Sequence, residues 1–156
     1  FSAEEAAAAV RADLERILNS TGDESAGTLR EEMQVVMMDK VSVFREEPGM
    51  AEAVQKIRQL RERYRHIKID DKSKRFNTDL LEAWELGCLL DLALVTAESA
   101  LARTESRGAH AREDYKKRDD ENWLKHTLAW LDADGNITLR YKPVKITHYQ
   151  PKERVY

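Results

Sequence analysis

Cysteine is almost absent from the sequence. The single residue of this kind, Cys88, excludes an internal disulfide and fits a protein that folds in a reducing compartment. Because leucines surround Cys88 in the sequence, we expect a small, buried thiol in the core rather than a reactive group.

Long uncharged apolar runs are also missing. The first eighteen residues alternate alanine with charge and lack the basic start of a signal peptide, so we expect neither a leader nor direct membrane insertion. The chain begins on Phe1 and enters a helical pattern almost at once, as expected for a segment of a longer protein.

Neither positive nor negative charge dominates the sequence. Lysine and arginine number 26 against 29 acids, giving a net charge of -3, and the two signs are interspersed. A nucleic-acid binder needs clustered cations that displace counterions from phosphates, so this class of partner is excluded. The most basic stretch, residues 56–68, is interpreted as a solvated helix face, with an anion-binding groove as the alternative.

The residues of common catalytic and cofactor sites are missing or scattered. The six glycines are isolated, so there is no phosphate-binding loop, and no nucleophile is paired with a base. The DADGN turn at 132–136 lacks the later glutamate of a calcium loop. The histidines are too dispersed for a zinc site, and His126 is interpreted as a packing residue. We therefore predict no catalytic, cofactor-binding or metal-binding residue in this chain.

Helical periodicity dominates the first two thirds. Apolar residues recur at three- and four-residue steps in four segments, which predicts helices at about 3–19, from a Thr28 cap to Pro48-Gly49, at about 50–66, and from an Asn77 cap to Arg103. The last helix is apolar on most of its circumference and should lie in the middle of the others. The predicted fold is mainly α, an antiparallel bundle of three to four helices over residues 1–104.

The pattern changes after Arg103. Residues 105–122, the charged loop, show neither helical nor strand periodicity. Alternation on both sides of the DADGN turn predicts a β-hairpin with His126, Leu128 and Trp130 on its apolar face, and an extended tail follows, with a possible third strand at 144–147. Residues 123–156 form this last part of one structural unit.

The charged loop contains the most distinctive motif, Arg107-Gly108-Ala109-His110 followed by Arg112 and Asp114. Glycine permits a sharp turn or a close approach, and arginines bind carboxylates and carbonyls in pairs of hydrogen bonds. Two interpretations stay open: the loop satisfies its own acids, or Arg107, Gly108, His110, Arg112 and Asp114 dock against another part of a larger protein.

A family resemblance favours docking. The R-G-A-H-x-R-x-D motif, the R-D-D-E-N-W-L-K-H-T segment at 118–127 and the closing P-K-E-R-V-Y at 151–156 together resemble the C-terminal portion of the flavoprotein subunit of succinate dehydrogenase and fumarate reductase. The preceding helices also match, so the resemblance covers essentially the whole chain.

The resemblance implies an FAD-dependent enzyme that interconverts succinate and fumarate and passes electrons to an iron–sulfur subunit. It also implies FAD-binding and capping domains upstream in the same polypeptide, and a cytoplasmic protein held at the inner face of the membrane through partner subunits. This chain would be an inactive docking domain whose arginines lack their partners, with a poorly ordered charged loop. A stand-alone helical interaction module and the same domain of L-aspartate oxidase are the alternatives.

Overall fold

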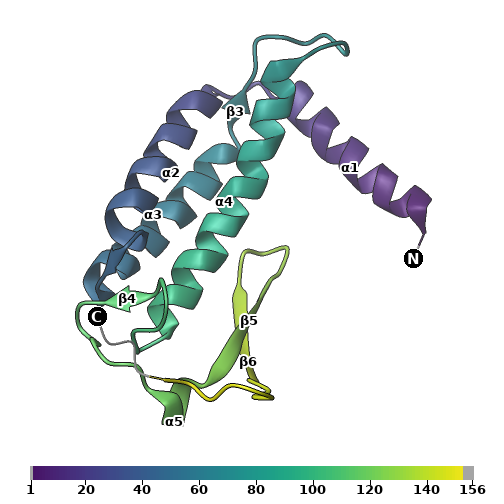
Figure 1. Ribbon diagram of the computed structural model, residues 1–156. Helices are drawn as coiled ribbons and strands as arrows, with labels where there is room; N and C mark the ends of the chain where they lie inside the picture. Colours follow the sequence, from purple (N-terminus) through teal and green to yellow (C-terminus); the bar gives the residue numbers. More distant parts are fainter. Residues whose placement is uncertain (1, 153–156) are drawn as a thin grey trace.

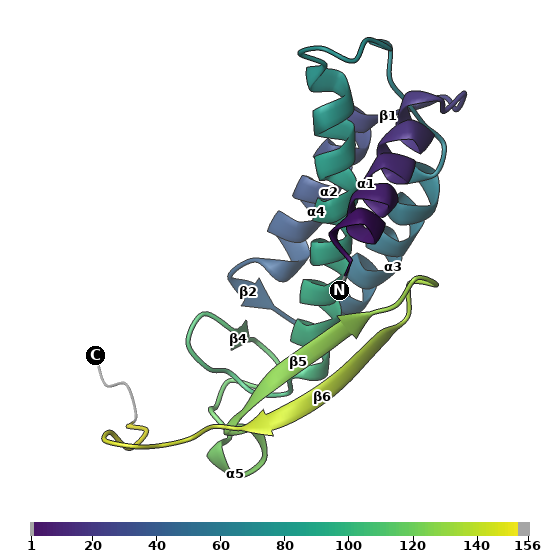
Figure 2. The same cartoon turned by 90° about the vertical axis from the view of Figure 1, so that its right-hand side faces the viewer.

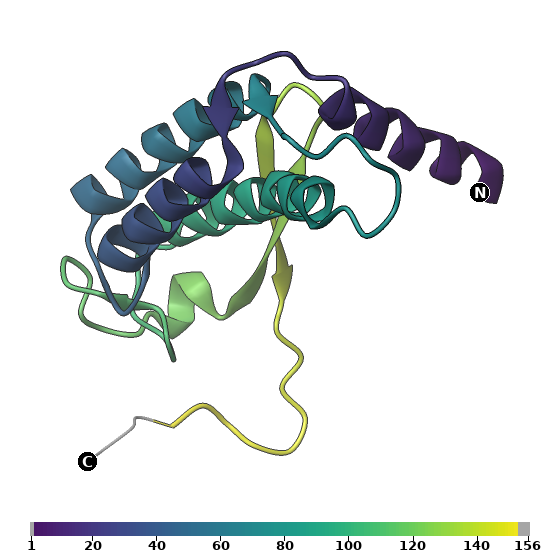
Figure 3. The same ribbon diagram turned by 90° about the horizontal axis from the view of Figure 1, so that it is seen from above.

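The computed structural model describes residues 2–152. Three long helices pack side by side as the core of the molecule: α2 (Ala26–Val41), α3 (Glu47–Tyr64) and α4 (Thr78–Ala102). Successive members run in opposite directions, which confirms the antiparallel bundle (Figure 1). Helix α1 (Ala3–Leu18) leads away from these three, as Figure 1 and the view from above in Figure 3 show.

Side-chain caps fix the starts of three of these helices. Ser2 accepts from Glu5 N and Asn77 from Leu80 N, as expected for N-caps. Helix α2 begins earlier than predicted, because Ser25 rather than Thr28 is its cap and accepts a hydrogen bond from Thr28 N.

The expectation that Pro48-Gly49 ends the second helix is wrong. Helix α2 stops at Val41, and Pro48 lies in the first turn of α3. Proline suits that position because the first helical N–H groups have no intrahelical partner. The same two residues therefore start a helix instead of ending one.

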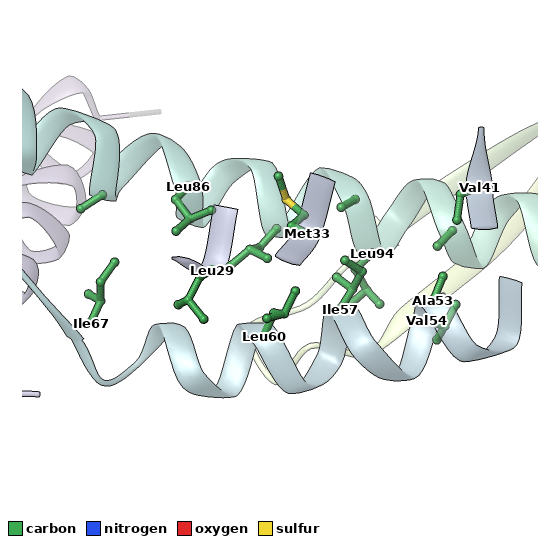
Figure 4. Close-up of a cluster of buried hydrophobic side chains, with 14 of the residues drawn as sticks. Leu29, Met33, Val41, Ala53, Val54, Ile57, Leu60, Ile67, Leu86 and Leu94 are labelled. Atoms are coloured by element: carbon green, nitrogen blue, oxygen red, sulfur yellow. The ribbon is translucent and has the colours of Figure 1, made fainter. Parts of the chain in front are cut away.

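Apolar side chains from the three packed helices fill the core, and Figure 4 shows Leu29, Met33, Leu60, Leu86 and Leu94 meeting between them. Helix α3 turns inward the residues that its periodicity predicts. Among residues 2–152 the buried apolar residues are Ile17, Leu29, Met33, Val41, Met50, Ala53, Val54, Ile57, Leu60, Ile67, Ile69, Ala83, Leu86, Leu90, Ala93, Leu94, Ala97 and Ala100.

One face of helix α4 stays exposed. Leu81 and Leu92 lie on it, and Cys88 is exposed as well, so the expectation of a buried core thiol is wrong. The physical reason is the course of α1, which packs Ile17 and the half-buried Leu18 on the core and then diverges from the bundle. Apolar composition around a helix thus does not place all of that helix in the interior.

Salt bridges connect the basic face of α3 to other elements. Arg63 binds Glu24 and Glu32, Arg58 binds Glu98, and Arg61 binds Asp91. A hydrogen bond from Arg63 lowers the pKa of Glu24, and hydrogen bonds from Lys56 and Arg63 lower that of Glu32. These arginines are therefore paired with carboxylates from neighbouring elements.

Two short parallel pairings join distant segments at the ends of the bundle. Strand β1 (Glu24–Ser25) pairs with β3 (Ile67–Lys68), and β2 (Phe44–Arg45) pairs with β4 (Ala111–Arg112). Sequence periodicity cannot reveal two-residue strands, and none of the four was predicted. The second pairing attaches the charged loop to the link between α2 and α3.

The predicted β-hairpin is confirmed, with β5 (Lys125–Leu131) antiparallel to β6 (Ile137–Pro143) after the single turn of α5 (Asp120–Trp123). Figure 2 shows it lying obliquely across the lower part of the helices. Leu131 and Ile137 pack on the core, and Arg58 donates to Gly135 O at 3.0 Å.

The predicted apolar face of β5 is wrong. His126, Leu128 and Trp130 are exposed, and the alternate residues of β5 turn toward the helices. Strand alternation defines two faces but does not say which one is buried when both carry apolar residues. Residues 144–147 form no strand, and the closing residues 153–156 lie outside the described part of the chain.

Candidate docking site

The charged loop lies at the end of the bundle where α2 and α4 finish and α3 begins (Figure 1). Strand β4 holds its middle against β2, and a second contact links Arg107 and His110 across a tight turn. Backbone hydrogen bonds therefore hold the loop at strand β4 and at the turn between Arg107 and His110.

Arg112 and Asp114 connect two helix ends. The guanidinium of Arg112, which is 1% exposed, donates to both carboxylate oxygens of Asp114 at 2.6 and 2.7 Å. It also donates to Leu101 O and Arg103 O at 3.1 and 3.2 Å, where α4 ends. Asp114 accepts from Glu47 N, the first residue of α3, at 2.9 Å.

The positive charge of Arg112 at the end of α4 and the negative charge of Asp114 at the start of α3 both have the sign that stabilises a helix end. The carbonyl end of a helix attracts a cation and its amide end attracts an anion. Helix α3 has no side-chain cap of its own, so Asp114 supplies it from a distant part of the sequence. The hydrogen bonds from Arg112 hold the pKa of Asp114 far below its ordinary value.

His110 is held between two partners. Its Nδ1 lies 2.7 Å from Nη1 of Arg45, and its Nε2 lies 2.9 Å from Arg103 O. Arginine can only donate and a carbonyl can only accept, so the imidazole is neutral and Nε2 carries the proton. Burial, assisted by the nearby arginines, lowers the pKa of His110. Arg45 also donates to Val41 O and Ser42 O, at the end of α2.

Arg107 binds a buried carboxylate. Glu105 is 0% exposed and accepts from Arg107 at 2.8 and 3.0 Å and from Asp119 N at 2.9 Å. Arg103 lies 3.2 Å from the same carboxylate, so two guanidinium groups compensate its charge. Arg107 also donates to Asp120, and these bonds raise the pKa of Arg107.

Gly108 is the open point of the motif. Its φ of +59° lies in the left-handed region, which suits glycine, and no atom lies within 4 Å of the position that a Cβ would take. Beside the loop, Phe44 and Val43 are exposed although both are apolar. Backbone at Gly108 and these two side chains are thus the parts accessible to another surface.

The expectation that the arginines lack partners within the chain is wrong, because Arg107 and Arg112 are both bound to carboxylates of the loop. The alternative left open, a loop that satisfies its own acids, describes these bonds. Two participants were not singled out from the sequence: Arg45 and Ser106, whose Oγ accepts from Arg112 N at 2.8 Å. Their contacts with His110 and Arg112 form only after folding, so no sequence pattern marks them.

We next consider which of the described residues are arranged to bind a metal ion or a cofactor. No group of three or more histidine, cysteine or acidic residues within 2–152 is arranged to hold a metal ion. Asp132 of the DADGN turn accepts from Asp134 N and Asn136 N within the turn itself. The elements between residues 2 and 152 do not include the succession of strand, glycine-rich turn and helix that is typical of dinucleotide-binding folds. No helix in that range is both long and apolar enough to cross a membrane.

Comparison with known proteins decides the family. The family model described as "Fumarate reductase flavoprotein C-term" matches residues 30–156. The chain belongs to this family. The matched range includes the charged loop and the hairpin of this chain.

Relatives with assigned names are flavoprotein subunits. The chain is 48% identical over 147 residues to the fumarate reductase flavoprotein subunit of Haemophilus influenzae, covering 94% of this chain and 24% of that protein. It is 45% identical over 160 residues to the succinate dehydrogenase flavoprotein subunit of Rickettsia bellii, covering 98% and 27%. The chain therefore spans about a quarter of the length of these relatives.

Solved structures agree in fold. A chain of Escherichia coli quinol fumarate reductase superposes with a TM-score of 0.92 at 44% identity, over 98% of this chain and 26% of that one. An Archaeoglobus fulgidus adenylylsulfate reductase, at 21% identity and a TM-score of 0.71 over 80% of this chain and 20% of that one, shares the fold alone.

Proposed function

We propose that this chain is the C-terminal domain of an FAD-dependent flavoprotein subunit that interconverts succinate and fumarate. The observation that carries the proposal is similarity to fumarate reductase and succinate dehydrogenase flavoprotein subunits along nearly the whole chain, at 43–48% identity. FAD and the reacting dicarboxylate bind in the part of the polypeptide outside this chain, and electrons pass on to an iron–sulfur subunit.

The domain's own task is mechanical. Arg107, His110, Arg112 and Asp114 hold the charged loop rigid against three helix ends, and Gly108 and Phe44, which pairs with Ala111 of the loop, present a surface to the FAD-binding and capping domains. A rigid loop loses little conformational entropy when it docks, so more of the contact energy remains for binding. The whole subunit is cytoplasmic and peripheral, attached at the inner face of the membrane through partner subunits.

Activity of the whole polypeptide tests the enzyme assignment. Purified with FAD, it should oxidise succinate with an artificial acceptor and reduce fumarate with a reduced viologen. Oxidation of L-aspartate by oxygen, with no turnover of either dicarboxylate, would assign the domain to L-aspartate oxidase instead.

Amide exchange tests the docking role. In the whole subunit, peptides covering residues 42–46 and 105–121 should be more protected than in this chain alone. Peptides from the middle of α4 serve as the control, because their amides are already hydrogen-bonded in the bundle. Equal protection of the loop peptides in both proteins contradicts docking.

A further inference from the structure

The loop of residues 70–77, between β3 and α4, carries the most exposed large apolar side chain of the described residues. Phe76 is fully exposed, at 102% of its reference area. Its φ of +49° makes it the one non-glycine residue among residues 2–152 with a left-handed backbone. A bulky residue rarely adopts this conformation, and such strain persists only where the surroundings impose it.

Hydrogen bonds within the loop impose that conformation. The side-chain amide of Asn77 donates to Asp71 O at 2.8 Å and to Ser73 O at 2.9 Å. The carboxylate of Asp79 accepts from Asp70 N and Asp71 N at 3.0 and 3.2 Å. The Asn77 side chain also caps α4. The backbone on both sides of Phe76 is therefore held in place.

Cations flank the ring. Lys72, Lys74 and Arg75 are exposed, and no ion pair of Lys74 or Arg75 is found within the described part of the chain. An apolar ring with unneutralised cations beside it complements an apolar recess bordered by carboxylates. The loop lies at the opposite end of the bundle from the charged loop, with the 25 residues of α4 between them (Figure 1).

We propose that Phe76 inserts into an acid-bordered apolar recess in the part of the flavoprotein polypeptide outside this chain. The inference rests on the proposed function, which supplies that longer polypeptide. A single phenylalanine buries roughly 200 Å², far below the roughly 1,200 Å² of a stable interface between separate proteins. A contact within one polypeptide can bury a smaller area, because the covalent connection raises the effective concentration of the two surfaces.

The alternative of an anionic membrane surface fits less well. Lipid-binding segments gather about 4–8 cations, whereas this loop has three. A fixed backbone also suits a shaped recess better than a fluid surface.

Photo-crosslinking in the assembled enzyme tests the proposal. With p-benzoylphenylalanine in place of Phe76, irradiation should give one main product that joins residue 76 to a peptide of the same polypeptide outside residues 1–156. The same probe at Glu62, an exposed position on α3, is the matched control. A product with another subunit, a second copy or phospholipid overturns the proposal, as does a yield no higher than at the control.

Two substitutions of Phe76 give an independent test of the proposal. Asparagine tolerates a left-handed backbone, so Phe76→Asn should raise the melting temperature of the whole subunit if the ring is exposed there. If the ring is inserted, the same variant should lower it by roughly 2–4 °C or more, and Phe76→Leu by less. A rise overturns the proposal.

Succinate and fumarate turnover, measured on the unsubstituted enzyme, separates the two hypotheses. A crosslink in an enzyme that turns over neither dicarboxylate supports the docking contact and rejects the proposed function. Turnover without the crosslink supports the proposed function and rejects the docking contact.

Discussion

Arg112 combines burial, a two-bond contact with Asp114 and bonds to the last carbonyls of α4. Its replacement by alanine removes the guanidinium donor from those carbonyls and leaves the Asp114 carboxylate with the Glu47 N–H as its remaining partner. Arg112→Ala should lower the free energy of unfolding by roughly 3–5 kcal/mol, the usual loss when one member of a buried pair is removed. Arg112→Lys should recover only part of this, because an ammonium cannot reproduce the planar fork.

Urea unfolding measures both changes. Arg65→Ala is the matched control, since Arg65 pairs with Glu62 at the surface and should matter by less than about 1 kcal/mol. If Arg112→Ala and Arg65→Ala cost the same, Arg112 does not couple the helix ends.

His110 makes stability depend on pH. Because its pKa is lowered below 6.5 in the folded chain, the unfolded chain takes up the proton at higher pH than the folded chain does. Its contribution is complete above pH ~6.5 and is lost as the pH falls through the lowered pKa. Asp114 adds a further loss below pH ~4, since its pKa is also lowered.

Melting temperatures between pH 7.5 and pH 5 should therefore fall more steeply for the unsubstituted chain than for His110→Gln. A variant of the exposed His126, His126→Gln, should keep the original slope. Parallel slopes for all three proteins would show that folding does not lower the pKa of His110.

At the scale of the helices, Gly87 allows α3 and α4 to approach. A Cβ at this position would lie 2.7 Å from Oη of Tyr64, which donates to Ala83 O at 2.8 Å. Gly87→Ala should lower the free energy of unfolding by roughly 1–2 kcal/mol, because the displaced ring loses this hydrogen bond.

Gly27→Ala is the control in the same measurement. The nearest atom to its added Cβ lies 3.7 Å away, so the helix preference of alanine should leave stability unchanged or slightly higher. Equal losses at both glycines would rule out a steric cause.

The orientation of the hairpin is a second question at this scale. Leu131 packs against the core, whereas Leu128 is 38% exposed on the other face. Leu131→Ala should cost roughly 1–3 kcal/mol of unfolding free energy and Leu128→Ala less than about 0.5 kcal/mol. The face predicted from the sequence requires the opposite order, and chemical denaturation distinguishes them.

These elements also show how far sequence patterns reach. The spacing of Ala53, Val54, Ile57 and Leu60 predicts the inner face of α3 because helix period and burial coincide there. The charged loop gave no such signal, since its order comes from Arg45 and His110, which are 65 residues apart. Proline and glycine at 48 and 49 were misread because the same residues suit a helix start and a helix end.

At the scale of the whole molecule, stability is unevenly distributed. Helix α1 buries only Ile17, and an isolated helix of its length is marginal in water. Amides in residues 3–12 should therefore exchange much faster than those in the middle of α4. Exchange followed by mass spectrometry decides this, and equal protection would mean that α1 packs more firmly than its burial indicates.

The contacts of Arg112 and Asp114 have a consequence for synthesis on the ribosome. The start of α3 and the end of α4 acquire these polar partners only after residue 114 has left the exit tunnel. A nascent chain that stops shortly after α4 has its helical segments but not the groups that complete their termini. We expect such intermediates to be held by chaperones and to mature in one late, cooperative step.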